Sequence, residues 1–173
     1  AFALDAASGE LKKLNDSDSG GPGPCHVIVD PKGECILVAN YGGGSVKCLK
    51  LAADGSIGTQ STFIQHAGSS VNASRQKEPH AHSTNVSPDG KFAVVADLGT
   101  DKLNVYKLDG GTAKIEANQP AYFSTHRGAG PRHFAWHPNG KWAYTNGELD
   151  ATVTAMSYDA KAGTFEKLNV STT

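Results

Sequence analysis

The chain has few cysteines, no long apolar run and no signal-like N-terminus. Its 173 residues include three cysteines, Cys25, Cys35 and Cys48, without CxxC spacing. This odd number indicates neither a disulfide framework nor a zinc site, and a reducing cytoplasm is the compartment we expect. No apolar stretch approaches the roughly 20 residues that cross a bilayer, and no basic segment followed by an apolar one opens the chain. The sequence therefore predicts neither a membrane protein nor a secreted one.

The chain also lacks a marked charge of either sign. Sixteen Lys and Arg residues balance seventeen Asp and Glu residues, and no block of five or more like charges occurs. We therefore expect neither a nucleic-acid partner nor a membrane partner. Turn-forming residues, by contrast, are abundant, with twenty glycines and eight prolines. Since long helical periodicity is scarce, these residues indicate many short strands joined by tight turns.

One turn signature recurs about every 50 residues. It occupies residues 30–33, 87–90 and 137–140, and each copy has Pro at its second position and Gly at its fourth. Pro presets φ for the second turn position and Gly tolerates a positive φ, so each copy predicts a hairpin turn. A short extended segment precedes each turn and a dense apolar run follows it. The pattern therefore predicts an antiparallel strand pair around each turn.

A third strand is predicted in each unit from residues that alternate with period two. These residues lie at the same distances after each turn glycine and are expected to share a buried face: Val46 and Cys48, Leu103 and Val105, and Val153 and Ala155. A polar turn and a further strand then close each unit. Residues 8–11 match the closing piece of one more unit.

Four-stranded antiparallel units of this length predict an all-β fold, a β-propeller with about 3.5 blades in this chain. The expected blade end covers 1–15, and the expected blades cover approximately 22–66, 78–124 and 129–173 of one partial domain. Since four to eight blades normally close a ring, we expect a missing half or self-association to cover the open blade edges. A β-sandwich of hairpins is the alternative, because periodic strands alone do not distinguish the two folds.

The blade ends opposite the turns bring reactive residues together. The residues eight positions from each turn glycine are expected at this rim: Cys25, His82 and Arg132 before it, and Tyr41, Leu98 and Glu148 after it. Because the first strand of every blade lines the channel, His82, Arg132 and Glu148 are expected to converge at one mouth. There they could respectively activate water, stabilise an oxyanion or bind an anion, and orient the base. This set suits ester or lactone chemistry, with a structural Arg–Glu salt bridge as the alternative.

Other polar residues near this rim have simpler explanations. His80 and His82 share one strand face, but no third and fourth ligands are visible, so we expect no metal. His26 and His133 follow the mouth position by one residue and are expected to face the other way, packing between blades. Arg75 lies in a long loop, where it could reach over the mouth as a substrate-binding residue together with His80. A solvated Arg75 is the preferred alternative.

Several stretches together resemble a known family. They are residues 23–26, 38–46, 75–83, 95–101 and 130–133, and their order and spacing make the match specific. They are similar to the lactonase family of seven-bladed β-propellers, which includes bacterial 6-phosphogluconolactonases and fungal carboxymuconate-lactonising enzymes. The resemblance implies a cytoplasmic enzyme of the pentose phosphate pathway. It would hydrolyse a sugar lactone, foremost 6-phosphogluconolactone to 6-phosphogluconate, without metal or organic cofactor.

The resemblance also implies site residues. The His of the family's Pro-His-x-His segment maps onto His82, with His80 as the less favoured choice, and the other matching positions are Arg132 and Glu148. A further family Arg, from a later blade, has no counterpart in the chain. The family commonly has Asn-Glu-Leu where this chain carries an extra glycine within 146–149, so a looser backbone is expected before Glu148.

Two other functions stay open at this point. A lactonising enzyme would run related chemistry on a muconate-type diacid, with Arg binding carboxylate. A non-catalytic propeller would bind a ligand or a protein through its funnel. For a partial chain, we expect activity to require the missing half or a partner chain that completes the ring.

Overall fold

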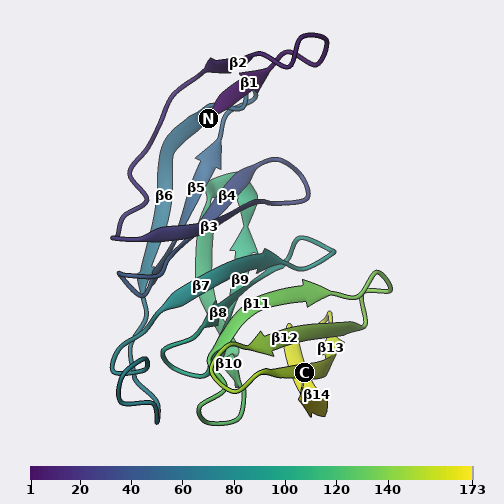
Figure 1. Ribbon diagram of the computed structural model, residues 1–173. Coiled ribbons are helices and arrows are strands. Elements are labelled where there is room, and N and C mark those ends of the chain that lie inside the picture. The colour runs from purple at the N-terminus through teal and green to yellow at the C-terminus, as the bar shows by residue number, and fades with distance from the viewer. Residues whose placement is uncertain (173) are drawn as a thin grey trace.

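The computed structural model of the chain describes residues 1–172. Its strands form three four-stranded antiparallel sheets and a two-stranded N-terminal hairpin (Figure 1). The hairpin consists of β1 (Phe2–Leu4) and β2 (Leu11–Lys13). The first blade consists of β3 (Pro24–Val29), β4 (Cys35–Asn40), β5 (Ser45–Leu51) and β6 (Ile57–Gln65). The second consists of β7 (Ala81–Val86), β8 (Phe92–Asp97), β9 (Lys102–Asp109) and β10 (Lys114–Ser124), with a 3₁₀ turn at Gly110–Thr112. The third consists of β11 (Pro131–Trp136), β12 (Trp142–Gly147), β13 (Thr152–Asp159) and β14 (Thr164–Thr172).

The three blades are arranged side by side through their first strands. β3, β7 and β11 follow one another across the molecule, and β7 contacts both of the others (Figure 1). Within each blade the strands pair in chain order, so every neighbouring pair is an antiparallel hairpin. This arrangement confirms the prediction of an all-β partial propeller of four-stranded blades. Among residues 1–172 there is no helix with the length and apolar character needed to cross a membrane.

One end of the blades, which we call the turn rim, carries the three Pro-x-Gly turns. The turn glycines have a positive φ, +69° at Gly33, +72° at Gly90 and +67° at Gly140. Side chains with a Cβ avoid this conformation, which explains why glycine occupies the fourth position. Each of these glycine N–H groups donates to the carbonyl oxygen three residues earlier, over 2.8 to 3.0 Å. The predicted turns therefore form as hydrogen-bonded hairpin turns.

Apolar side chains pack between successive blades rather than inside one sheet. The contact of the first and second blades includes Leu37, Val46, Cys48, Ala93 and Val95. The contact of the second and third blades includes Val94, Leu103, Val105, Ala143 and Met156. The second blade thus contributes alternate residues of β8 to two different cores, as the period of a strand requires. Removal of this apolar surface from water is the main stabilising contribution to the blade contacts.

The predicted buried face of the third strands is found in two blades but not in the third. Val46, Cys48, Leu103 and Val105 are buried, whereas Val153 and Ala155 are half-buried. The latter pair faces away from the second blade, and no further blade covers this face within the described chain. Instead, Met156 on the opposite face of β13 is fully buried against the second blade. Burial of the repeat position therefore depends on a following blade.

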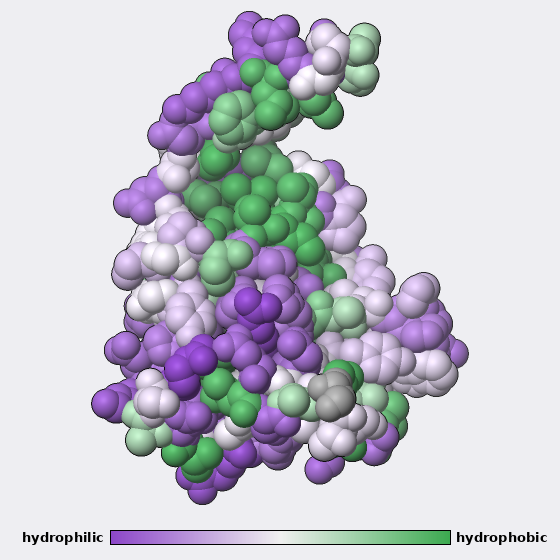
Figure 2. Space-filling view, viewed as in Figure 1, coloured by the Kyte–Doolittle hydropathy of each residue, from purple (hydrophilic) through white to green (hydrophobic). Residues whose placement is uncertain are grey.

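Both outer blade faces expose apolar side chains. On the first blade, 61% of Val27 and 51% of Val29 are exposed, and on the third blade 43% of Trp142 is exposed. Figure 2 shows the apolar area of the first blade below the overhanging N-terminal hairpin. That a missing half or a second copy of the chain covers these two faces stays a prediction.

A candidate active site at the mouth rim

The first strand of every blade contains a register shift close to its start. The shifts fall between Pro24 and His26, between Ala81 and Ser83, and between Pro131 and Phe134. Each shift adds one residue to the first strand: Cys25 in the first blade, His82 in the second, and in the third blade Arg132 and His133 together face the single residue Asn146. A bulge interrupts strict alternation and redirects the side chains at that point. All three mouth positions that glycine counting identified are therefore bulge positions, which the counting did not predict.

A repeated backbone hydrogen bond closes each hairpin at this end, which we call the mouth rim. The N–H of Tyr41 donates to the carbonyl of Gly23, that of Leu98 to His80, and that of Glu148 to Gly130, over 2.8 to 3.0 Å. The backbone of the three blades is thus equivalent here, although the side chains differ. Leu98 is fully buried, whereas Glu148 is exposed. Only the third blade presents a carboxylate at this position.

Glu148 lies between two arginines that come from different parts of the chain. Arg75, in the loop between β6 and β7, places Nη2 2.7 Å from Glu148 Oε1 and hydrogen-bonds to it. Arg132, in the bulge of β11, places Nε 2.7 Å from Glu148 Oε2. The Arg132 Nε makes no aligned hydrogen bond among residues 1–172, so its contact is an ion pair without hydrogen-bond geometry. Hairpin counting thus located Arg132 and Glu148 correctly, although they do not face each other in a regular ladder.

Arg75 differs from the preferred expectation of a solvated side chain. Besides its bond to Glu148, its Nη2 donates to the Tyr41 hydroxyl over 3.1 Å. Arg75 therefore reaches over the mouth and connects the first blade to the third. The loop that carries it is irregular, and no repeat position in the sequence marks this contact.

The two guanidinium groups set the charge state of the site. Partial burial by itself would raise the pKa of Glu148, but the hydrogen bond and charge of Arg75, followed by the charge of Arg132, outweigh burial and lower it. Glu148 is therefore a carboxylate at neutral pH and a weak base. Two cations against one anion leave this part of the mouth electropositive, which favours an anionic ligand or a developing negative charge.

His82 is the free imidazole of the site. Its Nδ1 is buried and has no hydrogen-bond partner in the part of the chain that the structure describes. Burial lowers the pKa of His82, the charges of Arg132 and His133 lower it further, and Glu148 opposes them only in part. The ring lies 5.6 Å from the Tyr41 ring and 5.2 Å from the His133 ring, centroid to centroid. His82 is thus held neutral at pH 7 beside Arg132, which suits a general base.

His80 has a different environment from His82. Its ring stacks on Tyr41, with centroids 4.5 Å apart and planes at 14°, and its Nδ1 lies 3.0 Å from the Tyr41 carbonyl oxygen. These contacts hold the His80 ring against the first blade. Tyr41, for which the sequence suggested no role, therefore contacts His80, His82 and Arg75 at once. Its position eight residues after a turn glycine was the one signal that placed it at the mouth.

The prediction that His26 and His133 both face away from the mouth is wrong for His133. The His133 side chain is exposed, and its Nε2 lies 3.0 Å from Arg132 Nη1. The physical reason is the bulge, which places two consecutive residues of β11 near the same opening. His26 follows the equivalent bulge of β3, and its ring lies 6.4 Å from the His133 ring, centroid to centroid, while its Nδ1 lies 3.3 Å from Thr84 Oγ1 of β7. Burial followed by the charge of His133 lowers the pKa of His26.

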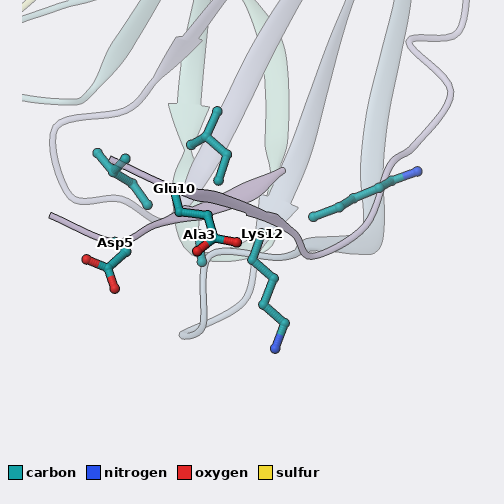
Figure 3. Close-up of a pocket in the computed structure, with 7 residues that line it drawn as sticks. Ala3, Asp5, Glu10 and Lys12 are labelled. Carbon is teal, nitrogen blue, oxygen red and sulfur yellow. The ribbon is translucent and has the colours of Figure 1, made fainter. Parts of the chain in front are cut away.

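Two observations bear on other sites. Within residues 1–172, no three His, Cys, Asp or Glu side chains are arranged to hold a metal ion. A hollow of about 600 Å³ lies along the N-terminal hairpin and is lined by seven residues that include Asp5, Glu10 and Lys12 (Figure 3). Its charged side chains point in different directions rather than toward a common centre (Figure 3). This open groove is built from other residues than the mouth rim and lacks convergent polar groups, so we place the candidate site at the mouth.

Comparison with known proteins agrees with the fold. The model of the family described as lactonase, seven-bladed β-propeller, matches residues 1–173. A 6-phosphogluconolactonase from Bacillus subtilis is 39% identical over 98% of this chain and 47% of its own length. A 6-phosphogluconolactonase from Formosa agariphila is 32% identical over 91% of this chain and 45% of its own. The structure of a periplasmic gluconolactonase from Pseudomonas aeruginosa superposes with a TM-score of 0.89 at 29% identity, over 99% of this chain and 48% of the other. The chain thus spans about half the length of these relatives.

Proposed function

The chain belongs to the lactonase family of seven-bladed β-propellers, and from this premise we propose that the protein hydrolyses a sugar lactone. The proposed substrate is 6-phosphogluconolactone, because the Bacillus subtilis and Formosa agariphila relatives carry the name of that activity. The proposed product is 6-phosphogluconate, an intermediate of the pentose phosphate pathway.

The observation that carries the proposal is the grouping of Arg75, Arg132, Glu148 and His82 at one rim. Glu148 is bound by both arginines, and the arginines lower its pKa, so it is a poor proton acceptor. His82 has a lowered pKa, so it is neutral, and its buried Nδ1 is not engaged in a hydrogen bond within residues 1–172. We therefore assign the base to His82 and give Glu148 the task of holding the arginines in place.

In the proposed reaction, His82 accepts a proton from water while the water oxygen attacks the lactone carbonyl carbon. The carbonyl oxygen becomes an oxyanion, which Arg132 stabilises through its charge. When the tetrahedral intermediate collapses, the bond between the carbonyl carbon and the ring oxygen breaks. The leaving oxygen takes the proton back from His82, and a hydroxy acid results. Arg75 and His80 are assigned to substrate binding, with Arg75 near the anionic end of the ligand.

Completion of the ring is part of the proposal. The exposed Val27, Val29 and Trp142 side chains lie on the two outer blade faces, where a missing half or a second copy of the chain would cover them. We also place the protein in the cytoplasm, which suits the free thiols of Cys25, Cys35 and Cys48. The Pseudomonas aeruginosa relative is periplasmic, so the compartment is tested by fractionation.

The experiment is a turnover assay on protein whose ring is closed by further blades or by a second copy. Acid release from 6-phosphogluconolactone is followed beside unphosphorylated gluconolactone and a muconolactone. The proposal expects the fastest turnover with the phosphorylated sugar lactone. Preference for the muconolactone would support the lactonising alternative. Saturable binding of lactones without any turnover would overturn the proposal and favour a binding module.

A further inference from the structure

Asp101 is a buried carboxylate that the proposed reaction does not use. It lies in the turn between β8 and β9, has a positive φ of 56°, and is 4% exposed. Burying an ionised carboxylate is costly unless hydrogen bonds satisfy its oxygens, so its partners indicate what it stabilises. The four groups that donate to its oxygens all lie outside the turn that carries Asp101.

The donors to Asp101 come from two separate loops. From the loop between β6 and β7, the Ser70 hydroxyl donates to Oδ2 and Gln76 Nε2 donates to Oδ1 over 2.7 Å. From the loop between β10 and β11, the N–H of Gly128 donates to Oδ2 over 2.6 Å and that of Gly130 to Oδ1 over 2.8 Å. One carboxylate therefore fastens two irregular loops to each other.

An arginine that pairs with Glu148 lies in the first loop, and another lies at the start of the strand that follows the second loop. Arg75 directly precedes Gln76, whose side chain is fully buried and also donates to the carbonyl of Leu98 over 2.9 Å. Arg132 follows Gly130 by two residues. The same Gly130 accepts the N–H of Glu148 through its carbonyl oxygen over 2.9 Å. Arg75 and Arg132 thus lie within two residues of a hydrogen-bond partner of Asp101. Glu148 is bonded to one such partner, Gly130, through the backbone.

We infer that Asp101 is the positioning residue of the mouth rim, and that it holds Arg75 and Arg132 on the two oxygens of Glu148. The inference rests on the proposed function for what the site does, but its test does not depend on that function. A side chain with a single acceptor oxygen cannot replace it. An Asn at this position would offer one oxygen to the four donors and would turn an NH2 group toward the rest.

A control residue exists at the opposite rim. Asp30 is 5% exposed and accepts backbone N–H groups from Lys32, Glu34 and Cys35, all in its own turn. Asp30→Asn therefore removes the same charge and disturbs a similar number of hydrogen bonds, but it touches no residue of the mouth. A merely structural effect of losing a buried carboxylate would appear in both variants.

The test is a carboxyl-carbon NMR titration of Glu148 in the chain itself, with the signal assigned by its loss in Glu148→Gln. In Asp101→Asn we expect the pKa of Glu148 to rise from its lowered position toward the ordinary Glu value, because the arginines leave it. In Asp30→Asn we expect no change. A folded Asp101→Asn with the wild-type titration of Glu148 would overturn the inference, and so would an equal rise in Asp30→Asn.

A milder variant covers the case in which Asp101→Asn does not fold. Ser70→Ala removes one donor to Asp101 and leaves the carboxylate in place, so we expect a smaller rise of the same sign. No rise in a folded Ser70→Ala would then overturn the inference. The titration needs no substrate, so a chain without lactonase turnover can still show the expected shift. That combination would refute the proposed function and leave the positioning role of Asp101 standing.

Discussion

At the turn rim, three different side chains accept a backbone hydrogen bond in the same way. At the mouth rim, the equivalent positions Tyr41, Leu98 and Glu148 carry side chains with different contacts. Asp30, Ser87 and His137 each accept a backbone N–H of their own turn, from a residue two to five positions away. At the mouth rim, Arg75 and Glu148 are 73 positions apart in the chain, yet they form a direct hydrogen bond. Contacts at the turn rim are therefore interchangeable between blades, and contacts at the mouth rim are not.

This difference shows that the turn rim serves to form the hairpins, whereas the mouth rim positions the candidate site residues. At each rim the hairpin backbone is the same in all three blades. The repeated bonds to the carbonyls of Asp30, Ser87 and His137 show this at the turn rim, and those to Gly23, His80 and Gly130 show it at the mouth rim. At the turn rim any side chain with a suitable acceptor satisfies the turn. At the mouth rim the bulges and long loops bring together side chains from all three blades. We therefore expect substitutions at the turn rim to change stability and substitutions at the mouth rim to change activity.

The largest expected effect is that of His82→Gln on turnover. Loss of the proposed general base should lower kcat/KM for 6-phosphogluconolactone by about 10²–10⁴-fold. The matched control is His137→Gln at the turn rim, where an amide oxygen can still accept the N–H of Asn139. We expect wild-type turnover in the control, measured by acid release. Equal losses in both variants would mean that the rims are not functionally distinct.

Arg132→Ala should have the next largest effect. Removal of a cation that stabilises an oxyanion is expected to lower kcat by about 10²–10³-fold. Lys141→Ala removes an exposed cation at the turn rim of the same blade and should leave kcat unchanged. Circular dichroism of both variants checks that the fold persists. A rise in KM alone for Arg132→Ala would assign Arg132 to substrate binding rather than to the oxyanion.

Asp30→Ala should show the reverse pattern, with lower stability and unchanged turnover. The substitution leaves the N–H of Cys35 without its side-chain acceptor, and Cys35 is fully buried. An unsatisfied buried donor costs about 1–3 kcal/mol, so the free energy of unfolding should fall by that amount in a urea titration. Lys32→Ala, in the same turn but exposed, is the control and should unfold like the wild type. A drop in kcat for folded Asp30→Ala would contradict the separation of the rims.

The same distinction explains how far the sequence could predict this molecule. Turn residues and period-two alternation report contacts inside one hairpin, so the blades, the turns and the nearness of Arg132 to Glu148 could be predicted. The bulge that redirects His133 could not, because alternation assumes a regular ladder. The contact of Arg75 depends on an irregular loop held by long-range hydrogen bonds. The partial exposure of Val153 depends on a neighbouring blade, which no residue within its own repeat reports.

The smallest expected effect is a shift of the pH profile. His82 acts as a base only when neutral, and burial, then the charges of Arg132 and His133, hold its pKa below the ordinary value of about 6.5. Turnover should therefore decline as the pH falls, with an inflection below pH 6.5. In Arg132→Ala the residual activity should decline at a higher pH than in the wild type, because one of the charges that disfavour the imidazolium is gone. The kcat/KM profile of both proteins between pH 4 and pH 8 measures the shift. An inflection above the ordinary His value in the wild type would show that the mouth rim stabilises the charged imidazole, the opposite of what burial and the charges of Arg132 and His133 require.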